Sequence, residues 1–141
     1  MTDEGYAVAP LEAVPVTDMA DVAAVPERFD PLDVHDVDEP LGTTASKPKV
    51  WTVPPGAHMG AHGHPTQEEV YLVLAGRFEV RIGPPGEAEA CEAGPGTLFR
   101  AAPHVARGYE NVGEGPGRVL VVAAPNVEED GIPAPELEDG G

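Results

Sequence analysis

The sequence has little of several features that would assign it to a common class of protein. Cys91 is the only cysteine, so no disulfide can form within the chain, and a reducing compartment suits it. No apolar stretch approaches the ~18 residues that a membrane-spanning helix needs. The first residues are acidic and lack a basic region followed by an apolar run, so they do not predict a signal peptide. We therefore expect a cytoplasmic protein.

Basic residues are scarce as well. Lys and Arg number 8 against 25 Asp and Glu, which gives a formal net charge of −17, and the only lysines are Lys47 and Lys49. Such a surface repels nucleic acids and anionic membranes, so we expect neither as a partner. This composition resembles that of cytoplasmic proteins from extreme halophiles, in which high salt screens the self-repulsion. The alternative is an ordinary protein with acidic tails.

Prolines and glycines, 17 of each, are spread along the chain, which argues against long helices and favours short strands joined by turns. At 141 residues the chain is long enough for one domain. Turns spaced by roughly 8–12 residues predict an all-β sandwich or closed barrel. The expected strands cover residues 50–53, 59–64, 69–74, 78–83, 87–92, 97–101, 105–112 and 118–124.

The two ends of the chain differ in composition from this strand-rich part. We expect residues 1–44 to wrap around a barrel formed by residues 45–125. Within this wrapping segment, residues 6–8 and 13–16 are candidate short edge strands, and residues 18–25 form at most one weak helical turn. Residues 126–141 are acidic and rich in Pro and Gly, so they predict a flexible tail.

The stretch from Pro54 to Gly76 carries the candidate chemistry. Residues i and i+2 of a strand share a face, so His62 and His64 would aim both imidazoles at one point, as a divalent metal requires. Glu69 could supply a third ligand from the start of a strand that pairs with the first. Two histidines and one carboxylate suit iron, manganese, nickel, copper or zinc, with coordination positions left open.

The same stretch resembles the first motif of the cupins. That motif is a glycine, five residues, His-x-His, three or four residues, Glu, six residues and a glycine. Its spacing is met in full by Gly56, His62, His64, Glu69 and Gly76. The resemblance implies a cupin-like double-stranded antiparallel β-barrel of the jelly-roll type, with one divalent transition metal inside. Since many similar proteins dimerise, it also implies a homodimer.

The second cupin motif is a glycine, five residues, Pro-x-Gly, two residues, His, three residues and Asn. Gly96 and Asn111 keep its outer spacing, but Ala102 stands for the proline and Arg107 for the metal-binding histidine. His104 is a candidate replacement for that fourth ligand. Its offset of three residues sends a side chain to the opposite face of a strand unless a bulge intervenes, and the alternative is a polar residue at the barrel rim.

Arg107 leaves three alternatives open. Its guanidinium could pair with Glu69 and replace the metal altogether. It could instead bind a carboxylate or phosphate of the substrate beside a three-ligand metal. In the third alternative it points out to the acidic surface.

Two further residues are candidates for substrate binding. A regular strand would place His58 on the same face as His62 but ~13 Å away, too far for a shared metal yet close enough to line a mouth. Tyr71 could contribute stacking surface, although a core role also explains it.

Two functions of different classes follow from the resemblance. The first is a metal-binding cupin that acts on a small organic molecule, with dioxygenase, isomerase or decarboxylase chemistry. The second is a non-catalytic cupin that binds or stores a small molecule, with or without metal. Because all of these occur on one fold, the fold does not choose among them.

Overall fold

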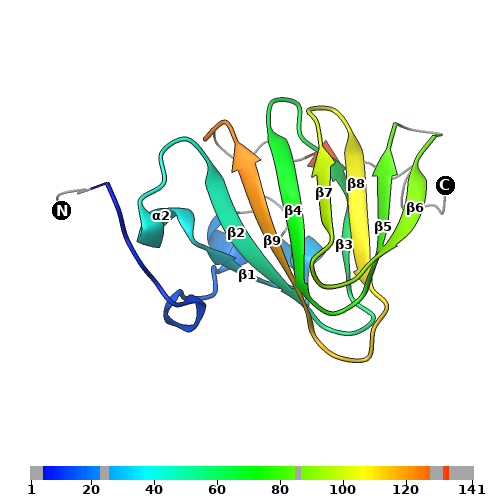
Figure 1. The fold of residues 1–141 in the computed structure, drawn as a ribbon, viewed down its shortest axis with the longest axis horizontal. Helices are drawn as coiled ribbons and strands as arrows, with labels where there is room; N and C mark the ends of the chain where they lie inside the picture. The colour runs from blue at the N-terminus through cyan, green and yellow to red at the C-terminus, as the bar shows by residue number, and fades with distance from the viewer. Residues whose placement is uncertain (1–4, 23–25, 85–86, 128–131, 134–141) are drawn as a thin grey trace.

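Two five-stranded antiparallel sheets form the body of the molecule in the computed structural model, which describes residues 5–22, 26–84, 87–127 and 132–133 (Figure 1). Sheet A has the strand order β1-β2-β9-β4-β7, and sheet B has the order β10-β3-β8-β5-β6. This arrangement confirms the expected all-β jelly-roll class. The described strands form two separate sheets rather than one closed barrel.

The strands of sheet A are β1 (Asp33–Asp36), β2 (Lys47–Val53), β4 (Glu68–Ala75), β7 (Leu98–Ala101) and β9 (Gly117–Ala124). Those of sheet B are β3 (His58–Gly63), β5 (Phe78–Gly83), β6 (Glu89–Ala93), β8 (Ala106–Asn111) and β10 (Ile132–Pro133). The eight expected strands are all present. The sequence pattern did not predict β1 or β10, and β10 lies in the segment expected to be a flexible tail.

Alternating side chains build the core between the sheets. In β5, Phe78 and Val80 are fully buried while Glu79 and Arg81 face outward, as the sequence predicts. In β4, Tyr71 and Val73 point into the same core. Burying one such side chain stabilises the fold by roughly 1.5–3 kcal/mol, so the inward faces of the two sheets hold the sandwich together.

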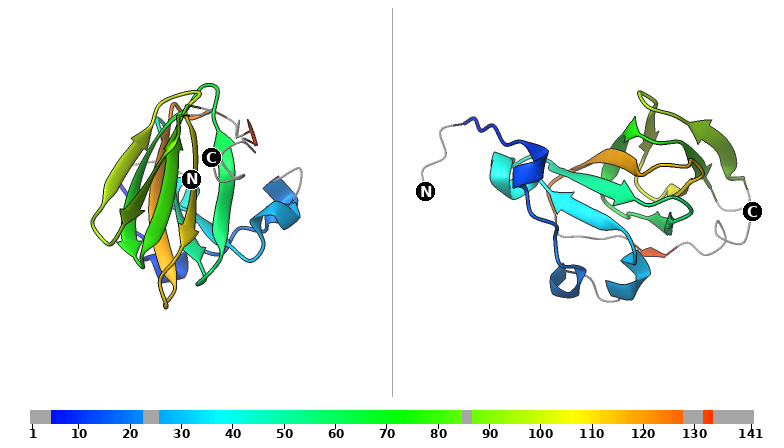
Figure 2. Two further views of the ribbon diagram at one scale, coloured as in Figure 1. Left: turned by 90° about the vertical axis from the view of Figure 1, so that its right-hand side faces the viewer. Right: turned by 90° about the horizontal axis from the view of Figure 1, so that it is seen from below.

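The N-terminal segment forms short turns along the edge of sheet A. These are η1 (Leu11–Ala13), α1 (Met19–Val22), η2 (Pro26–Phe29) and α2 (Asp38–Leu41), and Figure 2 shows them lying outside the strands. The expected edge strands at residues 6–8 and 13–16 are wrong, because neither range forms a strand. In the second range Pro15 lacks the N–H group that a ladder needs. The weak helical turn is confirmed as α1, and residues 23–25 lie outside the described part. No helix among the described residues is long and apolar enough to span a bilayer.

Two residues of the motifs fix the loops at one end of the sandwich. Gly76 has a φ of 89°, and a Cβ there would lie 2.7 Å from the Cα of Gly117, so only glycine suits this turn. Asn111 is fully buried and donates from Nδ2 to the carbonyls of Val53, at 2.8 Å, and Gly115, at 2.9 Å. Both residues therefore serve the backbone rather than a ligand.

Candidate metal centre

Three side chains with metal-binding atoms converge between the two sheets. His64 Nε2 lies 3.4 Å from Glu69 Oε1, and His62 Nε2 lies 4.0 Å from the same oxygen. The candidate ligand atoms of the three residues all lie within 4.8 Å of one another. Ligands bonded at ~2.1 Å to one ion are themselves separated by roughly 3–3.5 Å, so the cluster needs only a small contraction to hold a metal.

A β-bulge directs His62 into this cluster. Met59 lies opposite Tyr109, and His62 lies opposite Arg107, so β3 advances three residues while β8 advances two. In a regular strand an offset of three would place Met59 and His62 on opposite faces, but the extra residue of the bulge allows both to face inward. The expectation that His58 shares a face with His62 is therefore wrong.

Gly108 lies where β8 passes the bulge. A Cβ on Gly108 would lie 3.1 Å from the carbonyl oxygen of Met59 and 3.2 Å from both N and Cα of Ala61. These distances are shorter than ordinary van der Waals contacts, and two of the three atoms belong to one peptide of β3. The glycine therefore allows β3 to buckle toward β8 at this point.

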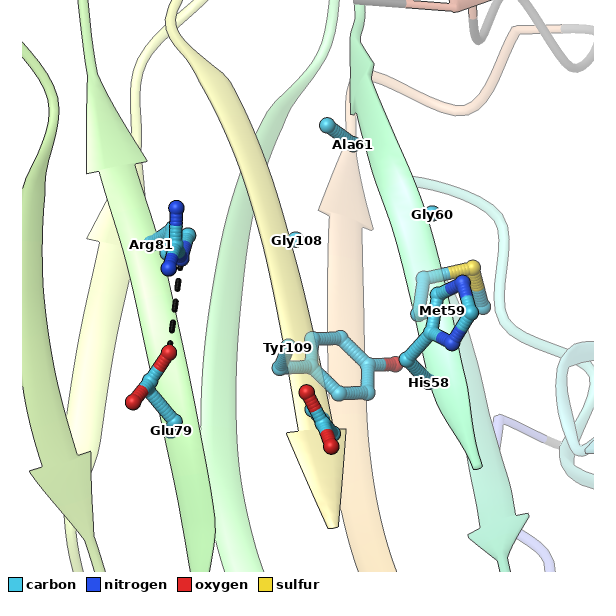
Figure 3. A pocket seen from close by; sticks show the side chains of 9 residues that line it. His58, Met59, Gly60, Ala61, Glu79, Arg81, Gly108 and Tyr109 are labelled. Carbon is cyan, nitrogen blue, oxygen red and sulfur yellow. Dashed lines mark hydrogen bonds and ion pairs between the residues drawn. The ribbon is translucent and has the colours of Figure 1, made fainter. Parts of the chain in front are cut away.

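The outer side of the bulge is a shallow hollow, with His58 on its rim. His58 is exposed and directly precedes the core residue Met59, so its side chain faces away from the core. Figure 3 shows His58 on β3 across Gly108 from Arg81 and Glu79 on β5, where Arg81 Nε donates to Glu79 Oε1. The structure thus does not bring His58 to the mouth of the metal cluster.

Glu69 enters the cluster from the opposite sheet. The expectation that its strand pairs with the histidine strand is wrong, because β4 belongs to sheet A and β3 to sheet B. Its neighbours across the ladder, Ala101 and Ala123, are small. The carboxylate can therefore reach across the interior toward the two imidazoles.

The carboxyl group of Glu69 is held in its ionised form. Burial by itself raises its pKa, but the contact with His64 and the hydrogen bond from Tyr71 Oη to Oε1 outweigh burial and lower the pKa to about 2. Burial, with the nearby Glu69 charge, raises the pKa of Tyr71 well above its usual range. Tyr71 therefore keeps its proton and orients Glu69, which is a different role from the substrate stacking expected of it.

His62 is held in the form that a metal requires. Its Nδ1 lies 3.0 Å from the carbonyl oxygen of Gly60, and since a carbonyl only accepts, Nδ1 carries the proton and donates it. Burial lowers the pKa of His62 to about 4, so the ring is neutral at pH 7. Its Nε2 lone pair is thus free of a proton and faces Glu69, as in protein metal sites where the second ring nitrogen is anchored.

Arg107 lies inside the sandwich, at the edge of the cluster. Its side chain is fully buried, so the alternative in which it faces the acidic surface is wrong. Nη1 donates to the carbonyl of His62 at 3.4 Å, and Nη2 donates to that of Ala101 at 3.5 Å. Nε lies 3.9 Å from Glu69 Oε1, too far for a hydrogen bond, so the bidentate pair with Glu69 does not form in this structure.

His104 remains outside the cluster. It is exposed, has a φ of 71°, and its backbone N–H donates to the carbonyl of His64 at 2.8 Å. The loop before β8 therefore carries its side chain to the rim, and the fourth imidazole proposed from the sequence is not assembled here.

Tyr109 is a site residue that sequence reasoning missed. It is buried beside Tyr71, with the two ring centroids 6.0 Å apart, and the Glu69 charge contributes to raising its pKa above the usual range, after burial. The signal was its spacing, because residues 107 and 109 share one face of a strand.

The residues present fit a divalent transition metal in donor type and spacing. Two neutral or neutralisable imidazoles and one ionised carboxylate are the ligands such ions take, and the cluster is largely closed to water. Arg107 opposes a cation, because its guanidinium cannot lose its charge. The carboxylate of Glu69 lies between the two and offsets that repulsion.

Comparisons with known proteins agree with this architecture. The cupin domain model matches residues 49–123, more than half of the chain, while comparison with curated proteins gives no match. An uncharacterised conserved protein with a double-stranded beta-helix domain from Klebsiella pneumoniae is 26% identical, with a TM-score of 0.58 over 65% of this chain and 76% of that chain.

Two solved structures of known description are similar in fold. One is a sugar phosphate isomerase of the cupin superfamily from Silicibacter pomeroyi, with a TM-score of 0.72 at 15% identity over 84% of this chain and 76% of that chain. The other is Lactobacillus farciminis oxalate decarboxylase in its formate complex, with a TM-score of 0.70 at 15% identity over 92% of this chain. Only 36% of the decarboxylase is covered, so this chain spans part of that protein. By its fold and by the family model, the chain belongs to the cupin family.

Proposed function

We propose that this cupin holds one divalent transition metal through His62, His64 and Glu69, and that this centre acts on a small organic molecule. The observation that carries the proposal is the convergence of the three ligand groups, from two different sheets, on one interior point. When bound, iron, manganese, nickel, copper or zinc would supply open coordination positions that can activate O2 or polarise a substrate oxygen.

The surrounding residues prepare the site for that role. Tyr71 holds the Glu69 carboxylate by a hydrogen bond, and the Gly60 carbonyl fixes the tautomer of His62. The buried walls exclude water, which strengthens every charge interaction inside. Glu69 and His62 are thus each positioned by a second group, which in metalloproteins is worth roughly 10–100-fold in metal affinity.

Isomerase and decarboxylase chemistry have the support of the similar structures, one described as a sugar phosphate isomerase and the other as an oxalate decarboxylase. At 15% identity the likeness concerns the fold. Dioxygenase chemistry is supported only by the open positions that a three-ligand site leaves for O2.

One observation favours the second function, non-catalytic binding of a small molecule without metal. The buried guanidinium of Arg107 lies 3.9 Å from Glu69 and supplies a positive charge at the edge of the cluster without any metal. In that case Arg107 would balance the Glu69 charge permanently, and the site would bind a small molecule without a metal.

Metal stoichiometry of His64→Ala tests the proposal. We expect one equivalent of metal per chain in the wild type after reloading and a severe loss in the variant, because two remaining ligands hold such ions poorly. His58→Ala is the matched control: this histidine begins β3, the strand that His64 directly follows, but it faces outward, so occupancy should not change. Full occupancy of His64→Ala would refute the ligand assignment, and a wild type that stays nearly metal-free would favour the binding function.

A further inference from the structure

Two buried hydrogen-bond donors on β8 have no partner among the described residues. They are the Nε of Arg107 and the hydroxyl of Tyr109. Arg107 is fully buried and Tyr109 is 4% exposed, so neither donor gains much from bulk water. An unsatisfied buried donor typically costs about 1–3 kcal/mol, and a native domain carries a few such groups, of which the Thr52 hydroxyl on β2 is another here. The Arg107 and Tyr109 donors differ from it because they lie two residues apart on one strand.

Both donors belong to the same wall of the interior. Residues 107 and 109 are separated by two, and their partners across the ladder, Ile82 and Val80, confirm that both point inward. Arg107 Nε lies at the edge of the metal cluster, 3.9 Å from Glu69 Oε1. The ring of Tyr109 packs against Tyr71 and Phe78 at centroid distances of 6.0 and 5.6 Å, which fixes the position of its hydroxyl oxygen.

Both groups also keep their protons at neutral pH. A guanidinium does not deprotonate in proteins. Burial and the Glu69 charge raise the pKa of Tyr109 above its ordinary value, so its hydroxyl remains a donor. The pair therefore offers two N–H or O–H donors, one of them charged, and no acceptor of comparable strength.

From these donors we infer that Arg107 and Tyr109 form an anion subsite that binds the carboxylate of a small organic acid beside the cluster of His62, His64 and Glu69. This names the substrate class for the site proposed above and rests on that proposed function. The charge balance supports it: Arg107 and Glu69 cancel, so a divalent ion would leave an excess of two positive charges for an organic anion to offset.

The test uses acetate as the probe and acetamide as its uncharged counterpart of the same shape. Thermal unfolding of the full chain is measured with sodium acetate, with sodium chloride at equal concentration, and with acetamide, in metal-free and in metal-reloaded protein. We expect acetate to raise the melting temperature beyond the effect of chloride, and acetamide to have no effect. A shift no larger than that of chloride would overturn the inference, because general screening would explain it.

Tyr109→Phe is the sharper variant because it removes only the unpartnered hydroxyl. We expect acetate affinity to fall by about tenfold or more, as for loss of a hydrogen bond to a charged group, while the stability of the acetate-free protein is unchanged or higher. A merely structural hydroxyl would give the opposite pattern. Arg107→Met should abolish acetate binding, and Arg81→Met, which removes an outward-facing arginine from the same sheet, should leave it intact. Equal acetate affinity in Tyr109→Phe and the wild type would overturn the inference.

The two proposals fail in different ways. If acetate binding depends on Tyr109 but metal occupancy does not depend on His64, the anion subsite stands and the metal centre falls. If metal occupancy depends on His64 while acetate affinity ignores both Arg107 and Tyr109, the metal centre stands and the anion subsite falls. The first case is tested by measuring acetate binding to the metal-free protein, because no ion can then hold the acetate.

Discussion

Arg107, which stands where the motif resemblance implies a metal-binding histidine, is fully buried. Burying an unpaired charge is costly, and a partner must offset it. Here the guanidinium donates to the carbonyls of His62 and Ala101 and lies near the ionised Glu69. The substitution thus changes the electrostatics of the whole site rather than removing one ligand.

Arg107→His tests that reading at the level of one residue. We expect this variant to bind metal more tightly than the wild type, by about tenfold or more, because it removes a repelling charge and adds an imidazole; about 1.4 kcal/mol suffices for that factor. Competition with a coloured chelator measures the affinity. Arg107→Met separates the two causes, since it relieves the charge without adding a ligand. Wild-type affinity in both variants would show that Arg107 does not influence the ion.

At the scale of elements, the strands could be predicted because alternation and turn residues leave a direct pattern in the sequence. The bulge in β3 could not, because it adds one residue without a composition of its own. This single residue decides that His58 faces out and His62 faces in. The sheet to which Glu69 belongs was also beyond a local pattern, because pairing between distant strands depends on the complete topology.

The site residues show the same division. The spacing of His62, His64 and Glu69 indicated a shared metal before any geometry was known, since it is a local property of the sequence. The orientation of Arg107 and the position of His104 depend on the loop before β8, which a local pattern does not define. The sequence therefore left three alternatives open for Arg107 and two for His104. Tyr109 is identified as a site residue by its buried hydroxyl, which lacks a hydrogen-bond partner among the described residues. No sequence pattern shows that property.

Gly108→Ala tests the bulge as an element. The added Cβ would press on Met59 and Ala61, so we expect a loss of about 1–3 kcal/mol in unfolding free energy and weaker metal binding as His62 is displaced. Denaturant unfolding and metal titration measure the two effects. Gly94→Ala is the control, because no atom lies within 4 Å of its Cβ position. If Gly108→Ala and Gly94→Ala have the same unfolding free energy and metal affinity, the close approach of β3 to Gly108 does not contribute to stability.

At the scale of the whole molecule, charge is the dominant feature. The family model and the two sheets confirm the cupin fold, whereas the halophilic origin and the homodimer remain predictions. A net charge of −17 on 141 residues should loosen the folded state through self-repulsion at low salt. Fold and charge are independent here, since a cupin needs no such acidity.

Salt dependence tests the charge. Raising NaCl from about 0.01 M to about 1 M shortens the Debye length from roughly 30 Å to 3 Å. If the acidity is an adaptation of the folded surface, the melting temperature should rise steeply over that range. A parallel series with an uncharged osmolyte separates screening from general exclusion effects. Equal melting temperatures at both salt extremes would place the acidity in the tails without consequence for the fold.

The origin of the ligand groups in two sheets has a consequence for the order of events in assembly. His62 lies in sheet B, His64 directly follows the same strand, and Glu69 lies in sheet A. Arg107 donates to the carbonyl of one residue from each sheet, His62 and Ala101. Neither sheet alone contains a complete site, so an ion or anion held there would be captured last as the sandwich closes and released first as it opens. Anything that binds only the closed form stabilises closure by mass action. The site would thus be complete only when the two sheets are packed together, and a bound ligand would stabilise that packing.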